Sequence, residues 1–521
     1  MAAPPTGPAV LAAARQTVLV IVETAAGKVE GLERAGALLF RGVPYAYADR
    51  FRPPEPTPPW SGVFDATRFG PSSPQEPSAS DALFGVEDQD FGEDCLNLNV
   101  FTPAADDAAR PVMVWIHGGS YLNGSGRSPY YNATRLALEG DVVVVTVNYR
   151  LGALGFLYLD HLAGDFTGSG VNGTRDQIEA LRWVRDNIAE LGGDPRRVTV
   201  FGESAGAMSV GTLLAAPEAR GLFHGAILQS GAAENVHTPE QAQRVTTHLL
   251  GQLEMGPDDV HHLVDLPVEE LLTAQAGAIE AVATSRPDPR QPGSGYLQLP
   301  FQPVVDGGLL TRPPLDAVRA GSAAGIPVIV GTNRDEWNLF ALQDTLGDIG
   351  PERLRRRVAR LVGDDRADEA ITLYQEARPG AHSSKLWCAM LTDRVFRMPA
   401  VRLAEAQLAH TDRVSTYRFD YASTALGGLA GACHAIEIPF VFDTVEQEGV
   451  RVLLGGIDDG TRALARTCAT AWTTMAHTGR PTHPGLDWPL YDLSRRATCV
   501  LGRDITVSAD PDGDIRAFWS A

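Results

Sequence analysis

The chain has 521 residues, of which 44% are hydrophobic and 21% are charged, a balance typical of globular proteins that bury a large core. Its 64 acidic and 44 basic residues give a formal net charge of −20, which argues against nucleic acid or an anionic membrane surface as a partner. The five cysteines are widely spaced and form no C-x-x-C pair, so neither a disulfide framework nor a zinc site is indicated.

Residues 1–18 are expected to form a loose tail before the first strand. This stretch has an apolar middle but no Lys or Arg before Arg15, so it lacks the positive region of a secretory signal peptide. No uninterrupted apolar run reaches the ~20 residues that a membrane span needs. We therefore predict a cytoplasmic location, with secretion left open, and no membrane partner.

Six short segments are predicted to be buried strands because they are rich in β-branched residues and bounded by turn formers. Their sequences are PVMVWIHGG, DVVVVTVNYR, RVTVFGES, GAILQSG, IPVIVGTN and STYRFDY. Such nearly continuous apolar strands are typical of a parallel sheet that is covered on both faces. Residues 174–191 lie between two of these strands, carry apolar residues at helical spacing and are followed by two glycines, which predicts a helix.

The alternation of strands and helices predicts an α/β fold with a large, mostly parallel central sheet and helices on both faces. We expect residues 19–521 to form a single domain. Insertions are expected around residues 65–92, 280–300 and 340–395, with helical segments over the active site, because insertions in α/β enzymes often form the walls of the site.

One predicted strand runs directly into the motif Gly202-Glu203-Ser204-Ala205-Gly206. In a G-x-S-x-G motif between a strand and a helix, the serine lies on a tight turn and the following helix directs N–H groups at the site. This context favours Ser204 as a nucleophile. The alternative, a polar residue in a glycine-rich turn, stays open on the motif alone.

A serine hydroxyl needs donors that stabilise an oxyanion. A second predicted strand ends in the glycine loop His117-Gly118-Gly119-Ser120, where backbone N–H groups can approach a substrate oxygen. A simple glycine turn would not explain why this loop and the serine motif each end a buried strand.

The serine also needs a base, for which the chain offers twelve histidines. His434 is the preferred candidate because it lies between a small-residue loop and an apolar segment. In the chain order Ser, Asp/Glu, His, an acid must lie between the serine and this histidine. Glu336 follows a buried strand and fits this order, but Asp335 and Asp306 remain alternatives on this reasoning.

Ordered matches from about Val22 to nearly the C-terminus carry a family resemblance. They are FRGVPYA, GEDCLNLNVFTP, WIHGGSY, VNYRLGALGFL, VTVFGESAGAMS, GLFHGAILQSG, GTNRDEW, LTDRVFRMPA and HAIEIPFVF. The chain resembles the type B carboxylesterases of the carboxylesterase/cholinesterase family, which have the α/β-hydrolase fold, and in particular their bacterial, para-nitrobenzyl-esterase-like members.

The resemblance implies a serine hydrolase that cleaves carboxylic esters through an acyl-enzyme. It implies Ser204 as nucleophile, His434 as base and Glu336, rather than Asp335, as the acid that orients the base. No metal or cofactor is expected. The expected partner is a small-molecule ester, and the expected assembly is a monomer or small homo-oligomer.

The resemblance also implies that the oxyanion donors are the N–H groups of Gly119, Ser120 and Ala205. Around these groups we expect three supporting residues, of which Ser209 would contact the acid; the three are Gly118, Glu203 and Ser209.

Two departures from the family and one shared pair lead to further expectations. Ser120 stands where glycine or alanine is usual, which retains the backbone donor and adds a hydroxymethyl group. Ser73 stands where a cysteine usually pairs with the family's early cysteine, so Cys95 is expected to be a free thiol. Arg50 and Glu93 match family positions that meet across a loop, so we expect a buried or half-buried salt bridge.

Other members of the resembled family allow two alternatives to an esterase. The first is a catalytically inactive adhesion or scaffold protein, but such members lack the nucleophile, which this chain retains. The second is an enzyme that prefers an amide, a carbamate or a lipid ester, and the expected catalytic residues do not separate it from an esterase.

Overall fold

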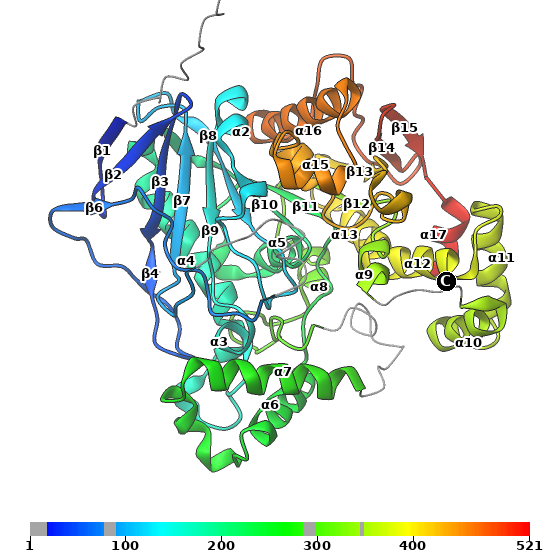
Figure 1. Ribbon diagram of the computed structural model, residues 1–521, viewed down its shortest axis with the longest axis horizontal. Coiled ribbons are helices and arrows are strands. Elements are labelled where there is room, and N and C mark those ends of the chain that lie inside the picture. The colour runs from blue at the N-terminus through cyan, green and yellow to red at the C-terminus, as the bar shows by residue number, and fades with distance from the viewer. Residues whose placement is uncertain (1–17, 78–89, 285–298, 344–348, 521) are drawn as a thin grey trace, which may run out of the picture.

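A computed structural model describes residues 18–77, 90–284, 299–343 and 349–520 of the chain (Figure 1). The predicted tail, apart from Val18, lies outside the described residues, as do parts of the three predicted insertions. Within the described residues, no helix is long and apolar enough to cross a membrane.

The centre of the molecule is one sheet, in which thirteen strands are described. In chain order they are β1 (Val18–Thr24), β2 (Gly27–Arg34), β3 (Ala37–Pro44), β6 (Val63–Asp65), β7 (Asn97–Thr102), β8 (Arg110–Ile116), β9 (Val143–Val147), β10 (Gly193–Glu203), β11 (Gly225–Gln229), β12 (Val328–Asn333), β13 (Val414–Phe419), β14 (Ala497–Leu501) and β15 (Thr506–Ala509). Their order across the sheet is β1-β2-β3-β7-β9-β8-β10-β11-β12-β13-β14-β15, with β6 beside β2. A short pair, β4 (Ala46–Tyr47) and β5 (Glu55–Pro56), lies outside this sheet.

The six predicted strands are confirmed as β8 to β13. From β9 to β14 all neighbours in the sheet are parallel. The pairs β1-β2, β2-β3, β3-β7 and β7-β9 on one side and β14-β15 on the other are antiparallel, and β6 pairs parallel with β2. The parallel strands β9, β11 and β12 are buried throughout, and β8 is buried at every position after Arg110, as their apolar sequences predict.

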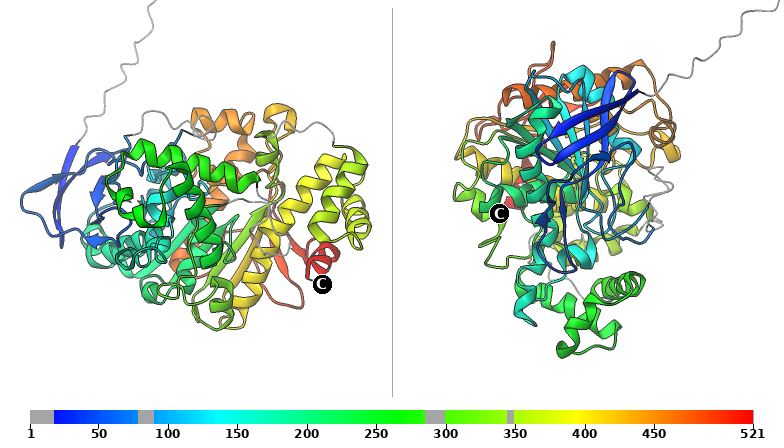
Figure 2. Two further views of the ribbon diagram at one scale, coloured as in Figure 1. Left: turned by 90° about the horizontal axis from the view of Figure 1, so that it is seen from below. Right: turned by 90° about the vertical axis from the view of Figure 1, so that its left-hand side faces the viewer.

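Both faces of the sheet are covered, and β8 shows how its side chains divide between them. Val112, Val114 and Ile116 enter one hydrophobic core, whereas Met113 and Trp115 enter another, because successive side chains of a strand point to opposite faces. Helices lie on both sides of the sheet in the views of Figure 2. The prediction of an α/β fold with a two-sided sheet is therefore confirmed.

The helices contribute to these two cores and to a third, peripheral hydrophobic cluster. The first core contains α4 (Asn172–Asn187), α5 (Ala205–Ala215), α8 (Pro314–Arg319) and α13 (Met398–Leu408), and the second contains α2 (Thr134–Gly140), α14 (Ile438–Val441), α15 (Glu448–Leu454) and α16 (Asp459–Thr478). In Figure 1, α6 (Pro239–Gln252) and α7 (Val268–Thr284) form a pair below the sheet, and α10 (Gly350–Val362), α11 (Ala367–Ala377), α12 (Ser383–Thr392) and α17 (Gly513–Ser520) gather at the right. The short helices α3 (Gly152–Phe156) and α9 (Asn338–Gln343) complete the described set.

The predicted helix at residues 174–191 is confirmed as α4, which continues into a 3₁₀ turn at Ile188–Leu191. The turn ends at Gly192, whose φ of 85° is a left-handed conformation that glycine adopts without strain.

Two expectations about the region of residues 50–95 are confirmed. Arg50 donates to both carboxylate oxygens of Glu93 at 2.6 and 2.5 Å, and the two side chains are 12% and 37% exposed. Cys95 is a buried free thiol. Ser73, at the usual position of its partner, accepts a hydrogen bond at Oγ from the N–H of Leu151 at 3.1 Å, so the serine has a structural contact of its own.

A second ion pair, between Arg150 and Asp176, is more deeply buried. Oδ2 of Asp176 accepts hydrogen bonds from the N–H and Nε of Arg150 at 3.0 and 2.9 Å, and Oδ1 accepts one from Nη2 at 2.7 Å. The side chains of Arg150 and Asp176 are only 5% and 0% exposed. Since Asp176 lies on α4 and Arg150 lies shortly after β9, this pair fixes the helix to the sheet.

We expect Asp176→Ala to lower the free energy of unfolding by about 3–5 kcal/mol, because it leaves a buried guanidinium without its partner. Denaturant unfolding of the purified variant measures this loss. The matched control is Asp368→Ala, which removes a carboxylate from an exposed pair with Arg355 and should cost about 0–1 kcal/mol. Equal losses in the two variants would contradict the assignment of a stabilising role to the buried pair.

Candidate active site

Ser204 occupies the single residue between β10 and α5, where its backbone has φ 56° and ψ −125°. Only small neighbours allow this turn: a Cβ on Gly202 would lie 2.6 Å from backbone atoms of Gly206, and a Cβ on Gly206 would lie 2.0 Å from the carbonyl oxygen of Ile116. The N–H of Ser204 donates to the carbonyl oxygen of Gln229 at 2.9 Å. The G-x-S-x-G pattern therefore folds locally as a strained strand-to-helix turn.

The glycine loop lies beside this turn because β8 and β10 are adjacent and parallel. A Cβ on Gly118 would lie 3.0 Å from Cβ of Ser204, so the loop touches the serine. Gly119 has a φ of 110°, and a Cβ there would lie 2.1 Å from the carbonyl oxygen of Asn123. Ser120 also has a positive φ, 58°, without being a glycine. The structure thus brings the loop and the serine together as predicted.

Three backbone donors in this region are free to bind a ligand. In the described part of the chain, no acceptor takes a hydrogen bond from the N–H groups of Gly119, Ser120 and Ala205. Ala205 is the first residue of α5, and the N-terminus of a helix favours negative charge.

His434 and Glu336 are in direct contact. Nδ1 of His434 donates to Oε2 of Glu336 at 2.7 Å. The other carboxylate oxygen of Glu336 accepts a hydrogen bond from the N–H of Asn333 at 2.7 Å, and the side chain of Glu336 is 0% exposed. Since Glu336 follows β12 and His434 follows the neighbouring strand β13, the parallel sheet brings the two residues to one edge.

The two rival acids contact other groups. The carboxylate of Asp335 accepts hydrogen bonds from the side chain of Arg334 and from the N–H of Ala432. Asp306 accepts hydrogen bonds from the N–H groups of the residues that follow it in its own turn. Of the three candidates, Glu336 is therefore the one that the structure places against the imidazole.

The second ring nitrogen of His434 faces Glu203. Nε2 lies 3.1 Å from Oε1 of Glu203, which lies directly before the serine. No hydrogen bond joins the ring to Oγ of Ser204 within the described residues. Such contacts are often long in a free enzyme and shorten when substrate binds.

The charges in this cluster shift one another's protonation. Burial raises the pKa of Glu203 to about 8; the nearby His434 opposes this shift, and two further glutamates add to it. Burial alone would lower the pKa of His434. The carboxylates of Glu203 and Glu336 outweigh burial and raise the pKa of His434 to about 9. The site therefore favours a positively charged imidazole.

Aromatic rings enclose the histidine. The rings of Phe340 and Phe396 lie 5.2 and 4.9 Å from the ring of His434 between centroids. Phe396 belongs to a π-helical turn, Asp393–Arg397, between α12 and α13. Such turns occur frequently at functional sites.

Sequence reasoning missed a buried polar network beside this cluster. Glu437 accepts hydrogen bonds from Gln229 at 3.1 Å and from Asn333 at 2.6 Å, and Trp472 donates to Gln229 at 2.9 Å. Burial raises the pKa of Glu437. The available signal was a lone acid in the apolar segment HAIEIPFVF, three residues after the histidine.

The structure does not place Ser209 where it was expected. Its Oγ accepts a hydrogen bond from Nε2 of Gln177 at 3.0 Å, and both carboxylate oxygens of Glu336 have other partners. The reason is the direction of α5, which turns Ser209 toward Gln177 on α4. The expected contact between Ser209 and the acid is therefore wrong. Among the described residues, no group of three or more His, Cys, Asp or Glu side chains could hold a metal ion.

Solved structures define the class of protein to which this fold belongs. The structure matches a carboxylesterase of Geobacillus stearothermophilus with a TM-score of 0.83 and 42% identity, covering 96% of this chain and 99% of the other. It matches a thermophilic PNB esterase with a TM-score of 0.84 and 38% identity, covering 95% and 99%. The fold is that of the α/β-hydrolases.

Sequence comparison then gives the family. The model of the carboxylesterase family matches residues 19–511. The chain is 39% identical to the para-nitrobenzyl esterase of Bacillus subtilis (strain 168) over 502 residues, covering 95% of this chain and 97% of that protein. It is 35% identical to the phenmedipham hydrolase of Pseudarthrobacter oxydans over 495 residues, covering 92% and 95%. The chain belongs to the carboxylesterase family and is an enzyme that hydrolyses carboxylic esters.

The glycine loop generates a prediction. We expect Gly119→Ala to reduce ester hydrolysis strongly and to lower stability, because the added Cβ would overlap the carbonyl oxygen of Asn123 and the φ is left-handed. Ester turnover and thermal unfolding measure the two effects. Gly221→Ala is the control: its φ is 81° but nothing lies within 4 Å, so it should cost only about 1–2 kcal/mol and leave turnover unchanged. Full turnover in Gly119→Ala would contradict the importance of the loop.

Proposed function

We propose that the chain hydrolyses carboxylic esters through an acyl-enzyme, with Ser204 as nucleophile, His434 as general base and Glu336 as the acid that orients the base. The observation that carries this proposal is the hydrogen bond of 2.7 Å between His434 and the fully buried Glu336, at the sheet edge where the strained turn holds Ser204. These residues follow β10, β12 and β13, so each is held at the carboxyl end of a parallel strand.

The reaction proceeds in two halves. Nε2 of His434 takes the proton of Ser204 as Oγ attacks the ester carbonyl, and the resulting imidazolium gives the proton to the leaving alcohol as the carbon–oxygen bond breaks. Water then enters, loses a proton to Nε2 and attacks the acyl-enzyme. The released acid carries the acyl group, and the proton returns to Ser204.

The negative oxygen of each tetrahedral intermediate is held by the N–H groups of Gly119, Ser120 and Ala205. Their lack of acceptors in the described part of the chain supports this role. Donors fixed before the reaction stabilise the charge as it develops, which is worth several kcal/mol per donor in related sites. Gly118 supports the loop by leaving room for it against Ser204.

Glu336 and Glu203 have different tasks at the imidazole. Glu336 accepts the Nδ1 proton and so keeps Nε2 as the basic nitrogen. Glu203 lies at Nε2 and stabilises the imidazolium that forms in each half of the reaction. Because both carboxylates are buried, their effect on the ring is larger than in water.

The substrate class that we propose is a small ester with an apolar or aromatic part, since Phe340 and Phe396 lie beside the base. Relatives are named for activity on para-nitrobenzyl esters, phenmedipham and fumonisin B1. A panel of para-nitrophenyl esters of increasing acyl length, together with para-nitrobenzyl and aromatic-acid esters, tests this class. Equal kcat/KM for all of them would contradict an aromatic preference.

Substitution of the three residues tests the assignment. Ser204→Ala and His434→Ala should each lower kcat about 10⁴-fold or more, and the double variant should lose little beyond either one because the two residues act as a unit. Glu336→Gln should lower kcat less, since the base remains present. Labelling with a fluorophosphonate probe should be abolished in Ser204→Ala and strongly slowed in His434→Ala, because the probe needs a serine that its base has activated. Normal turnover in folded Ser204→Ala would overturn the proposal.

The pH dependence tests the role of Glu203. In the parent enzyme, kcat/KM should fall as pH falls through the raised pKa of His434, because only the neutral ring accepts a proton. Glu203→Gln removes a carboxylate that favours the imidazolium, so the pKa of His434 should fall and activity should persist to lower pH. Profiles of kcat/KM against pH for the parent enzyme and for Glu203→Gln give the pH at which each loses activity on the acid side. If Glu203→Gln lost activity at the same pH as the parent enzyme, or at a higher pH, this role would be contradicted.

A further inference from the structure

The loop that carries His434 is attached directly to the loop that carries Glu336. The N–H of Asp335 donates to the carbonyl oxygen of Ala432 at 2.9 Å, and the N–H of Ala432 donates to Oδ2 of Asp335 at 3.0 Å. Asp335 therefore binds both the N–H and the carbonyl oxygen of Ala432, two residues before the histidine, the first with its side chain and the second with its own N–H. A backbone contact at 3.3 Å, from the N–H of His434 to the carbonyl oxygen of Glu336, continues this pairing.

Two amide side chains complete the attachment. Nδ2 of Asn333 donates to the carbonyl oxygen of Cys433 at 2.8 Å, and Nδ2 of Asn338 donates to that of Ala430 at 3.1 Å. Asp335 differs from these in being charged, and a hydrogen bond to a carboxylate is about twice as strong as a neutral one. It is the contact whose loss should move the loop most.

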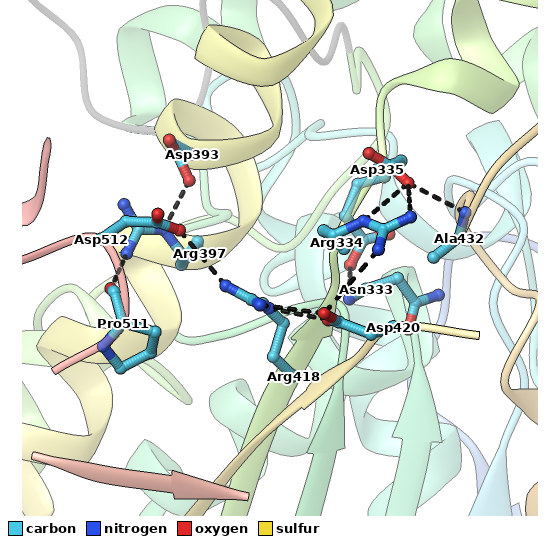
Figure 3. A network of polar contacts seen from close by, with 11 residues as sticks. Asn333, Arg334, Asp335, Asp393, Arg397, Arg418, Asp420, Ala432, Pro511 and Asp512 are labelled. Atoms are coloured by element: carbon cyan, nitrogen blue, oxygen red, sulfur yellow. Dashed lines mark hydrogen bonds and ion pairs between the residues drawn. The ribbon is translucent and has the colours of Figure 1, made fainter. Parts of the chain in front are cut away.

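Asp335 is itself held by a chain of alternating charges (Figure 3). Arg334 lies 3.0 Å from Asp335 and 3.8 Å from Asp420. Asp420 pairs with Arg418 at 2.7 Å, and Arg418 pairs with Asp512 at 3.2 Å. The charges are partly buried and come from segments far apart in the sequence, so they orient Asp335 rather than leave it free to rotate.

The end of this network at Asp512 lies next to a contact of the π-helical turn that carries Phe396, the ring beside His434. Arg397 donates to the carbonyl oxygen of Pro511, next to Asp512, at 3.0 Å and pairs with Asp393 at 2.5 Å (Figure 3). Asp393 and Arg397 begin and end the π-helical turn that carries Phe396, whose ring packs on the histidine. The backbone before the base and the ring beside it are thus anchored to two groups of charges that meet at the neighbouring residues Pro511 and Asp512.

We propose that Asp335 is a positioning residue for ester hydrolysis: by binding both the N–H and the carbonyl oxygen of Ala432 it sets the position of His434 relative to Ser204. Asp335 touches neither the imidazole nor the serine in the described structure. The inference rests on the proposed role of His434 as the base.

Two variants separate the role of the Asp335 side-chain oxygen as a hydrogen-bond acceptor from the role of its negative charge. Asp335→Ala removes both, and kcat should fall about tenfold to a hundredfold with KM within about twofold, because a displacement of about 1 Å at the base is enough for this loss. Asp335→Asn keeps an oxygen that can accept from Ala432, so most of the lost kcat should return. A role in stability alone would not give this rescue at temperatures well below unfolding.

The matched control is Asp186→Ala. Asp186 forms an ion pair with the preceding residue, Arg185, at 2.7 Å, the same arrangement as Arg334 and Asp335, but it lies on α4. Its kcat and KM should equal those of the parent. A large loss of kcat in this variant would overturn the specific role given to Asp335.

Hydrogen exchange gives a readout that does not depend on turnover. In Asp335→Ala, peptides covering residues 429–436 should exchange faster than in the parent, whereas Asp186→Ala and Asp335→Asn should retain protection. If Asp335→Ala does not fold, Asp335→Asn alone carries the test through its kcat and its exchange. Parental kcat and exchange in Asp335→Ala would overturn the proposal, as would an Asp335→Asn variant as impaired as Asp335→Ala.

Failure of this inference is distinguishable from failure of the proposed catalytic residues. A loss of about 10⁴-fold in Asp335→Ala, with Glu336→Gln near parental activity, would make Asp335 the orienting acid and overturn both. Active Ser204→Ala would overturn the proposed function whatever Asp335 does. Impaired Asp335→Ala, rescued Asp335→Asn and inactive Ser204→Ala together would support both.

Discussion

The backbone conformation of Ser204 is the constraint on which the site depends. A positive φ at a non-glycine residue is tolerated only where the neighbouring chain leaves room and holds the turn in place. Gly202, Gly206 and Gly118 leave that room, since a Cβ on any of them would lie at 3.0 Å or less from other atoms. The close packing has a second effect. It places the end of β8 against the turn, so the glycine loop lies directly beside Ser204. The N–H groups of Gly119 and Ser120, which bond no acceptor among the described residues, are thereby brought to the serine.

A second constraint is the concentration of acids in a dry interior. Glu203, Glu336 and Glu437 are 3%, 0% and 1% exposed around a histidine that is 6% exposed. Buried carboxylates are costly unless each has partners. Glu336 and Glu437 have theirs, whereas Oε1 of Glu203 makes no hydrogen bond with a described residue and faces the ring nitrogen of His434. Glu203, whose Oε1 has no hydrogen-bond partner among the described residues, is therefore the carboxylate that lies beside Nε2 of His434 and stabilises a positive charge there.

The parts that sequence predicted well are those with a local signal. Strands β8 to β13 and α4 follow from apolar runs and helical spacing, and the turn at Ser204 follows from its glycines. The edge strands β1, β2 and β15 are more exposed, so their apolar pattern is weaker. Contacts between distant segments left no such signal. Residue spacing could not separate Asp335, which contacts Arg334 and Ala432, from Glu336, which contacts His434. The contacts of Ser209 were also misjudged. The side-chain partners of Glu437, Gln229 and Asn333, come from two separate strands, β11 and β12, so they were missed.

The pairing of the two loops bears on how precisely an acid and a base can be placed when nearly a hundred residues separate them. The sheet fixes where β12 and β13 end, but each loop then runs free of the ladder, and Ala435, next to the histidine, has a positive φ of 66°. Were each loop held only by its own packing, small errors in the two positions would add. Direct hydrogen bonds between the loops, including those of Asp335 and Asn333, make the positions depend on each other. The distance from Glu336 to His434 is then set locally, and the sheet has only to bring the pair to Ser204.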